Sequence, residues 1–388
     1  MLGDEADSPR GRIQLIRGLA STDEAPDDSV VGHLEACLVC RACETACPSG
    51  VPFGRIMEGA REVLRERERP RRVAGLMRRV GLGTVMRQGR LRMATALMDR
   101  YVRAGLQRLV RATRLLPSRL AWLESFVRPA EGLPYVPVER TDADVALFAG
   151  CIMRAAFGET DRATERLLER AGSRVTSPGE QTCCGALHAH SGDGETARAL
   201  ARANIDAFGG SEIPIATNAA GCGAHLKAYG DVLSGDTAWA VRARAFAARV
   251  RDATELISPA TVRRGPVRPL RVVYQDACHL AHGQKIRREP RALLAAMPNV
   301  TVVPIADAER CCGSAGVYNL THPEVAAELQ RQKVVAILAA KADVVVSANP
   351  GCILQVAAGL DRVGAPIPVV HLLRFVDDPS ASLGAQRS

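Results

Sequence analysis

The sequence predicts an α+β protein in which a small helical N-terminal domain is followed by two repeated α/β units. Two observations support this fold class. The twelve cysteines of the 388-residue chain fall into three groups of four, and the second and third groups repeat at a spacing of 127–130 residues. Strand-like and helix-like segments alternate around both repeated groups, which is typical of α/β units with largely parallel sheets.

The composition is that of a folded chain. A hydrophobic fraction of 47% and a charged fraction of 24% argue against global disorder. No apolar run approaches the roughly 18 residues that a membrane-spanning helix needs. Residues 1–12 carry no apolar signal core. We therefore expect a cytoplasmic protein, with a peripheral position on the inner face of the membrane as the alternative.

The first cysteine group has the spacing of an iron–sulfur site. Cys37, Cys40, Cys43 and Cys47 form a C-x2-C-x2-C-x3-C-P run. Three closely spaced thiolates can bind one 4Fe–4S cluster, while the fourth thiolate of such a run usually binds a second cluster. A zinc knuckle is the alternative, although it normally uses two separated C-x2-C pairs. We expect a helix over residues 54–68 after this run.

An arginine-rich helical segment is expected next, over residues 61–128. Residues 61–130 hold 18 Arg and five acidic residues, so the net charge of +9 is concentrated here. A helical wheel places an apolar face opposite a basic face. These faces comprise Met98, Val102, Leu106 and Leu109, opposite Arg100, Arg103, Arg111 and Arg114. We expect the basic face to contact a partner or the anionic membrane surface, with a simply solvated face as the alternative.

Residues 129–137 predict a linker into the repeated units. Each unit is expected to run from a buried strand to a single cysteine, a helix, a Cys-Cys-Gly sequence, a second helix, a strand and a Gly-Cys pair. The expected strands are 145–149, 213–217, 271–275 and 343–347, and the expected helices are 159–171, 195–208, 290–297 and 323–339. The two cysteine groups are Cys151, Cys183, Cys184 and Cys222, and Cys278, Cys311, Cys312 and Cys352.

The repeated cysteines are expected to bind iron–sulfur clusters. Ligands collect beyond the carboxyl ends of parallel strands, where these cysteines fall. Adjacent cysteines cannot easily bind one zinc ion tetrahedrally, but they can bind neighbouring irons, and the following glycine permits a positive φ. Zinc and buried free cysteine are the alternatives. Three nearby histidines are candidates to tune or bind iron, although a loop histidine bonded to a carbonyl is the commoner case. They are His188, His190 and His279.

The sequence contains no motif for a flavin or a nicotinamide. Residues 192–194 and 221–223 are isolated G-x-G pairs without a third glycine, and no G-x4-G-K-S/T phosphate loop occurs. We therefore expect the hydride chemistry to lie on another chain, with no catalytic residue on this one and no nucleic-acid partner.

The repeated cysteine pattern resembles the cysteine-rich CCG domain family. This family includes the heterodisulfide reductase B subunit, the anaerobic glycerol-3-phosphate dehydrogenase C subunit, lactate-utilisation proteins and the glycolate oxidase iron–sulfur subunit. Its motifs usually end in C-x2-C. In this sequence the position of the second cysteine of that pair is occupied by His225 in the first repeat and by Gln355 in the second. The missing fifth thiols argue against a noncubane cluster pair and against disulfide cleavage.

A narrower resemblance is to the glycolate oxidase iron–sulfur subunits. Residues 3–13 resemble the segment between two ferredoxin motifs of that family, and residues 37–51 resemble its second motif. The resemblance covers essentially the whole chain. It implies an electron-transfer subunit with a 4Fe–4S cluster at the ferredoxin-type motif and a further cluster at the CCG repeats. Electrons would come from FAD-containing 2-hydroxy-acid dehydrogenase subunits and pass to quinone or another acceptor.

The family's first ferredoxin motif is missing ahead of residue 1. We expect either an upstream start that encodes it, or at best one labile cluster, because Cys47 would otherwise have to fold back as a fourth ligand. A heterodisulfide-reductase-like or lactate or glycerol-3-phosphate dehydrogenase-type redox subunit, and a zinc-stapled binding protein, are the alternatives. The expected domains are 1–70 (helical, ferredoxin-like), 71–140 (Arg-rich connector), 141–268 (first CCG repeat) and 269–388 (second CCG repeat).

Overall fold

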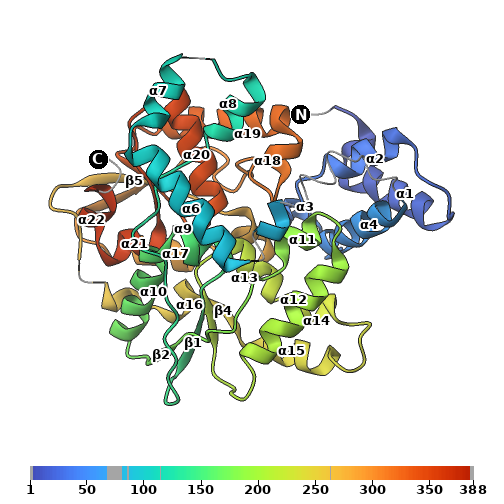
Figure 1. The fold of residues 1–388 in the computed structure, drawn as a ribbon, viewed down its shortest axis with the longest axis horizontal. Helices are drawn as coiled ribbons and strands as arrows, with labels where there is room; N and C mark the ends of the chain where they lie inside the picture. The colour runs from blue at the N-terminus through green and yellow to red at the C-terminus, as the bar shows by residue number, and fades with distance from the viewer. Residues whose placement is uncertain (1–2, 68–80, 85–86, 114, 263, 385–388) are drawn as a thin grey trace.

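The computed structural model describes residues 3–67, 81–84, 87–113, 115–262 and 264–384, and it confirms the α+β fold class. Two small parallel sheets are surrounded by helices, and a helical lobe from the N-terminal part of the chain lies at one side of them (Figure 1). Among the described helices, none combines the length and the apolar character needed to span a bilayer.

The N-terminal lobe is held by a small apolar core. Leu34, Phe53 and Met57 pack around Cys37 and Val39, the start of the first cysteine run. The predicted helix over 54–68 is confirmed as α4. The elements of the lobe are η1 (Glu5–Asp7), α1 (Pro9–Ala20), α2 (Asp28–Glu35), α3 (Ala42–Ala46) and α4 (Phe53–Arg67).

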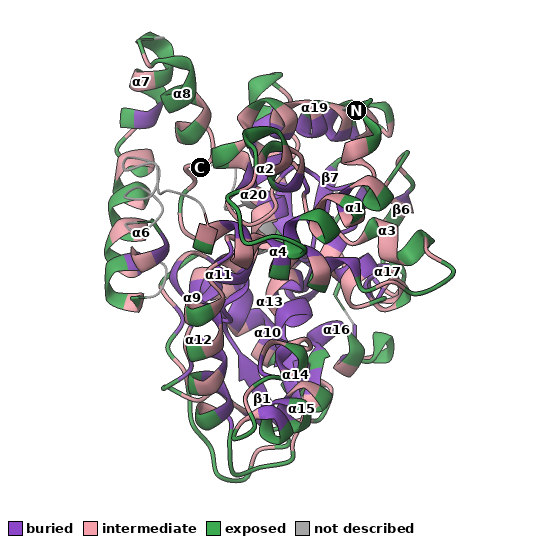
Figure 2. Ribbon diagram, turned by 90° about the vertical axis from the view of Figure 1, so that its right-hand side faces the viewer, coloured by how far each residue is buried: buried purple, intermediate pink, exposed green. Residues whose placement is uncertain are grey.

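The predicted continuous amphipathic helix of the connector is wrong. The chain turns at Gly105, whose φ of +73° ends one helix and starts another. Met98 on the first of these helices and Leu106 and Leu109 on the second are all exposed. The two helices, labelled α6 and α7, are drawn mainly as exposed or half-buried (Figure 2). Arg114 lies outside the described residues. The connector helices are α6 (Gln88–Arg103), α7 (Leu106–Thr113) and α8 (Ser118–Glu124).

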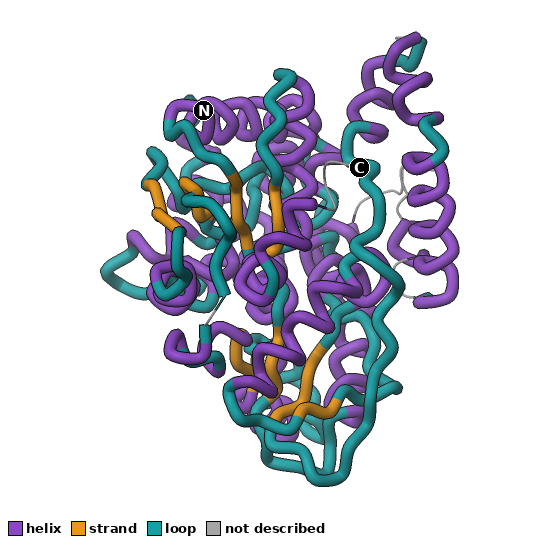
Figure 3. The backbone as a smooth tube through the Cα atoms, turned by 90° about the vertical axis from the view of Figure 1, so that its left-hand side faces the viewer, coloured by secondary structure: helices purple, strands orange, loops and turns teal. Residues whose placement is uncertain are grey.

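Each repeat contains a four-stranded parallel sheet with the same strand order, and Figure 3 shows the two sets of strands. The first sheet has the order β2-β1-β3-β4, from β1 (Val145–Phe148), β2 (Val175–Thr176), β3 (Ile215–Thr217) and β4 (Val250–Asp252). The second has the order β6-β5-β7-β8, from β5 (Leu270–Gln275), β6 (Val300–Val303), β7 (Val344–Ser347) and β8 (Val369–His371). The strands β2, β4, β6 and β8 were not anticipated. They are the edge strands of the two sheets, and they lack the continuous apolar run of the central strands.

The predicted helices of the repeats are confirmed to within two residues. The helices from the first repeat are α9 (Cys151–Ala156), α10 (Gly158–Arg170), α11 (Ala186–His190), α12 (Gly194–Ala207), α13 (Ala220–Leu226), α14 (Tyr229–Val232), α15 (Ala240–Arg249) and α16 (Ala253–Leu256). Those that follow are η2 (Pro259–Thr261), η3 (His279–Gly283), α17 (Arg288–Ala295), α18 (Tyr318–Thr321), α19 (Pro323–Ala339), α20 (Pro350–Arg362), α21 (Leu372–Asp377) and α22 (Pro379–Gly384).

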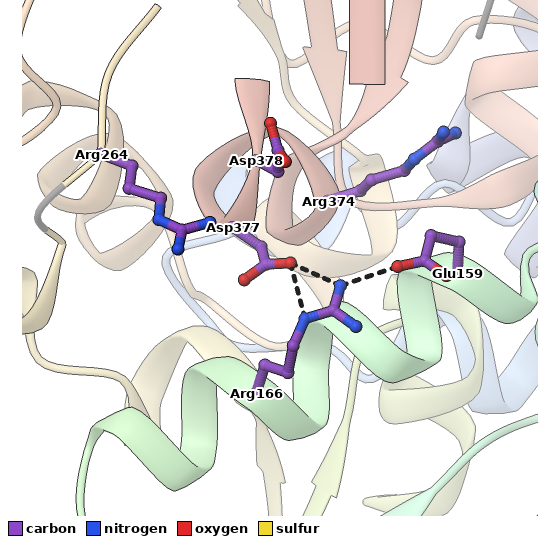
Figure 4. A pocket seen from close by; sticks show the side chains of 6 residues that line it. All are labelled: Glu159, Arg166, Arg264, Arg374, Asp377 and Asp378. Atoms are coloured by element: carbon purple, nitrogen blue, oxygen red, sulfur yellow. Dashed lines mark hydrogen bonds and ion pairs between the residues drawn. The ribbon is translucent and has the colours of Figure 1, made fainter. Parts of the chain in front are cut away.

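The two repeats share one apolar core. Leu147 of β1, Val345 of β7 and Phe375 of α21 belong to the same buried cluster. At the edge of this contact Arg166 of α10 binds Asp377 of α21 at 2.5 Å (Figure 4). The charged pocket drawn there contains none of the cysteines. It is therefore part of the contact between repeats rather than of the thiol sites.

His371 at the end of β8 also joins the repeats, because its Nε2 lies 2.8 Å from the carbonyl oxygen of Asn218. Burial lowers the pKa of His371 from 6.5 to about 4. Between these two pKa values the imidazole is protonated in the unfolded chain but neutral in the folded chain. The free energy of unfolding therefore decreases as the pH falls from 6.5 towards 4. We predict that the wild type loses about 2 kcal/mol more than His371→Gln between pH 7 and pH 5. Urea unfolding of the iron-free proteins measures this, and equal pH slopes would contradict it.

Candidate metal centre

The repeated cysteines lie just after the carboxyl ends of the parallel strands, as predicted. In the first repeat Cys151 follows β1, the pair Cys183–Cys184 follows β2 and Cys222 follows β3. In the second repeat the corresponding cysteines follow β5, β6 and β7. Because these strands are neighbours in each sheet, four thiols meet at the carboxyl ends of the strands. The cysteine pairs lie in loops, whereas Cys151, Cys222 and Cys352 lie in the first turns of helices rather than in the loops expected.

The thiols of the first repeat contact one another. Cys151 Sγ donates to Cys183 Sγ at 3.6 Å, and Gly185 N donates to the same sulfur at 3.5 Å. The thiol of Cys184 hydrogen-bonds to those of Cys183 and Cys222. The hydrogen bond from Cys151 lowers the pKa of Cys183. One member of this group is therefore disposed to be a thiolate, the form that binds iron.

The second repeat holds its four thiols in the same series of contacts. Cys278 hydrogen-bonds to Cys311, Cys311 to Cys312, and Cys312 to Cys352. Asn349 donates through Nδ2 to Cys352 Sγ at 3.6 Å. All four cysteines are buried. The hydrogen bond to Cys311 and burial raise the pKa of Cys278.

The glycine after each cysteine pair allows the tight turn that brings the pair to the other thiols. Gly185 has a φ of +91° and Gly313 a φ of +93°, so the predicted positive φ is confirmed at both positions. A Cβ atom at Gly313 would lie 2.7 Å from the carbonyl oxygen of Ala326. Glycine is therefore required there for both backbone conformation and space.

The thiols of the first cysteine run lie in two kinds of surroundings, which shift their pKa values in opposite directions. Cys37, Cys40 and Cys43 interact electrostatically, and burial raises the pKa of Cys40 and of Cys43 to about 11. Cys47 is partly exposed, and hydrogen bonds from the backbone of Val51 and its neighbours lower its pKa. The pKa of Cys47 is thus shifted in the opposite direction from that of Cys40 and Cys43, and its role as a fourth ligand stays a prediction.

The N-terminal thiols lie next to those of the second repeat. Cys40 interacts electrostatically with Cys278 and Cys311. Thr45 in α3 contacts His282 in η3 at 3.0 Å between Oγ1 and Nδ1. The first and second repeats are joined in turn by Asn349, whose Oδ1 accepts from the backbone N–H of Gly221 at 3.1 Å. The three cysteine groups are thus neighbours in the fold.

Buried polar side chains fill the region between the three groups. His190 stacks on His279 with ring centroids 5.3 Å apart, and its Nδ1 lies 3.0 Å from Glu58 Oε1. Burial alone would raise the pKa of Glu58, but His190 lowers it to about 2. Burial also lowers the pKa of His225 to about 4 and that of His279 to about 3, so both imidazoles are neutral.

Several of these groups have no hydrogen-bond partner within the described part of the chain. They include the Nε2 atoms of His188, His225 and His279. The sequence pointed to His188, His190 and His279. It did not indicate that His225 and Glu58 also lie in this buried polar region, and Glu58 is far away in sequence. No spacing rule points to Glu58, because only the packing of α4 on the first repeat brings it here.

The repeated thiols are the donors that an iron–sulfur cluster uses. Seven of the eight are buried, and polar atoms without a hydrogen-bond partner in the described part of the chain lie around them. Within the described ranges, no group of three His, Cys, Asp or Glu side chains is placed to hold a single metal ion.

Comparison with known proteins agrees with this donor set. The cysteine-rich domain (CCG) family matches residues 145–227 and 272–357. A probable glycolate oxidase iron-sulfur subunit from Bacillus subtilis (strain 168) is 36% identical over 386 residues, covering 95% of this chain and 87% of that protein. The chain belongs to the glycolate oxidase iron-sulfur subunit family.

Other members of this group of proteins are also similar. The glycolate oxidase iron-sulfur subunit of Escherichia coli (strain K12) is 33% identical, covering 96% of this chain and 89% of its own length. Lactate utilization protein A of Exiguobacterium sp. (strain ATCC BAA-1283 / AT1b) is 30% identical over 61% of this chain and 97% of its own length. The family resemblance stated from the cysteine motifs is therefore confirmed.

The connector covers the thiols of the first repeat, which its sequence did not indicate. Leu91 of α6 is buried against Cys151 and Cys183. The N-terminal lobe contacts both repeats, through α4 and α11 in the first and through α3 and η3 in the second. The first repeat is therefore covered by both the connector and the N-terminal lobe.

The glycine after the second cysteine pair provides a test of this geometry. We predict that Gly313→Ala lowers the free energy of unfolding by about 2–3 kcal/mol, because it combines a clash with a strained φ. It should also lower the iron content, since the turn positions Cys311 and Cys312. The matched control is Gly364→Ala, which has a φ of +69° but no atom within 4 Å of the added Cβ. An equal loss in both variants would contradict the steric argument.

Proposed function

We propose that the chain is the iron–sulfur subunit of a flavin-dependent 2-hydroxy-acid dehydrogenase, with glycolate as the substrate. It would pass electrons from FAD-containing partner subunits to quinone or another acceptor. The observation that carries this proposal is the meeting of three cysteine groups inside one fold. The substrate site belongs to a partner chain, and we assign no catalytic residue here.

The cysteines are the proposed ligands, and the bound clusters would supply one-electron transfer. A flavin takes two electrons as a hydride, and iron–sulfur centres remove them singly. A 4Fe–4S cluster is proposed at the first group, and the further cluster expected at the repeats is proposed here as one iron–sulfur centre in each repeat. The ligands are Cys37, Cys40, Cys43, Cys47, Cys151, Cys183, Cys184, Cys222, Cys278, Cys311, Cys312 and Cys352.

The contacts support an order of electron transfer. Cys40 interacts with Cys278 and Cys311, whose repeat is linked to the first repeat through Asn349 and Gly221. We propose that electrons pass from the N-terminal thiol group to the second repeat and from there to the first. Seven of the eight repeat cysteines are buried, which limits the access of water to this route.

The connector is the proposed contact for partner subunits or for the cytoplasmic membrane surface. Leu97, Leu109 and Leu120 are exposed on its three helices. Two of the basic residues are engaged within the chain, since Arg103 binds Asp99 and Arg111 binds Glu124. The exposed leucines therefore support a docking role more than the arginine count alone. The division at residues 70, 140 and 268 remains our proposed domain organisation.

Single cysteine substitutions test the ligand assignment. We predict that Cys311→Ser, in chain made anaerobically, loses iron and alters the paramagnetic spectrum of the second repeat. Cys47→Ser should leave the cluster at Cys37, Cys40 and Cys43 in place, because the fourth thiolate of such a run usually binds a second cluster. Retention of all iron and an unchanged spectrum in Cys311→Ser would show the assignment to be wrong.

Electron transfer from a partner tests the function itself. The anaerobic chain is mixed with the flavoprotein subunits and glycolate, and reduction is followed by electron paramagnetic resonance. We predict glycolate-dependent signals that are absent without the flavoprotein. Lactate serves as the comparison, because the lactate utilization relatives make it the alternative substrate. Fully reduced flavin without any cluster signal would contradict the proposal.

A further inference from the structure

Lys333 is a buried cation beside the thiols of the second repeat. It lies within α19 and is 2% exposed. Its Nζ donates to the carbonyl oxygens of Asp307 at 2.8 Å and Ala308 at 3.0 Å. Within the described ranges, no carboxylate forms an ion pair with it. Burying an ammonium group without a counter-charge costs several kcal/mol, so its position needs an explanation.

The acidic groups that interact with Lys333 are three cysteines of the second repeat and Asp276. The ammonium interacts electrostatically with Cys312, Cys352 and Cys311, in that order. The next acidic group is Asp276, which is already bound by Arg291 at 2.7 Å. Four thiolates around iron and sulfide carry a net negative charge, whereas four protonated thiols carry none. Only the cluster-bound form of this site compensates the lysine.

In the first repeat an uncharged side chain occupies the position that corresponds to Lys333 and makes similar hydrogen bonds to the backbone. Its counterpart is Asn204 of α12, which accepts from the backbone N–H of Thr182 at 2.8 Å and donates to Cys183 O at 3.0 Å. Asn204 and Lys333 thus both hold the loop that precedes a Cys-Cys pair. The first repeat instead has a guanidinium near Cys151, from Arg154. The two repeats therefore place their cations differently.

We propose that Lys333 is the buried counter-ion of an anionic iron–sulfur cluster held by Cys278, Cys311, Cys312 and Cys352. This inference rests on the proposed function, because it requires a cluster at the second repeat. Reduction adds negative charge to the cluster, so a nearby cation stabilises the reduced state and raises the reduction potential. Lys333 thereby makes the second repeat a better electron acceptor for the neighbouring N-terminal group.

The test is a redox titration of the anaerobic chain, with the second repeat's signal identified by its absence in Cys311→Ser. We expect Lys333→Met to lower the reduction equilibrium constant of that signal about tenfold, which is about 59 mV for one electron. Lys333→Arg, which keeps the charge, should stay close to the wild type. The control is Arg331→Met, which removes a cation from the exposed side of the same helix.

The outcomes distinguish a counter-ion from a loop anchor. A reduction potential that is lower in Lys333→Met, but not in Lys333→Arg or Arg331→Met, supports the proposal. So does loss of iron in Lys333→Met with retention in Lys333→Arg, since the cluster would then need the charge to assemble. An unchanged potential with full iron in Lys333→Met would overturn it, as would iron loss in both variants, which would indicate loop anchoring only. A wild-type chain without iron would instead refute the proposed function.

Discussion

The structure depends on one constraint, which is that many thiols must be gathered inside a protein without leaving them in water. Two short parallel sheets meet this constraint because neighbouring strands end at the same edge. The segments that follow β1, β2 and β3, and those that follow β5, β6 and β7, then supply four sulfurs each. The shared core that includes Leu147 and Val345 fixes one edge relative to the other.

Covering these edges is the task of the remaining parts of the chain. The α6 helix places Leu91 over the first thiol group, and α3 packs against the loop that follows Cys278. The same packing brings Cys40 to the second repeat. Shielding from water and proximity for electron transfer thus come from the same contacts, and altering one would alter the other.

Electrostatics distinguishes two units that have the same strand order. The second repeat has a fully buried lysine at the position where the first has Asn204, and the first repeat has Arg154 near Cys151. The imidazoles of His225 and His279 are held neutral by burial and contribute no positive charge. Duplicated thiol sites can therefore differ in reduction potential without any difference in their ligands.

The sequence by itself determined the cysteine groups, the repeated order of elements and the family, because these depend on local spacing and on the identity of residues such as Gly185 and Gly313. It also predicted that Cys47 serves a different site from Cys37, Cys40 and Cys43, which stays a prediction. The edge strands were missed, since they lack the continuous apolar run of the central strands. Only the tertiary structure decided which groups are neighbours, and it brought Glu58 to His190, Asn349 to Gly221 and Lys333 to the second thiol group. Those contacts join residues far apart in the chain, and long-range packing leaves no periodic signal in a sequence.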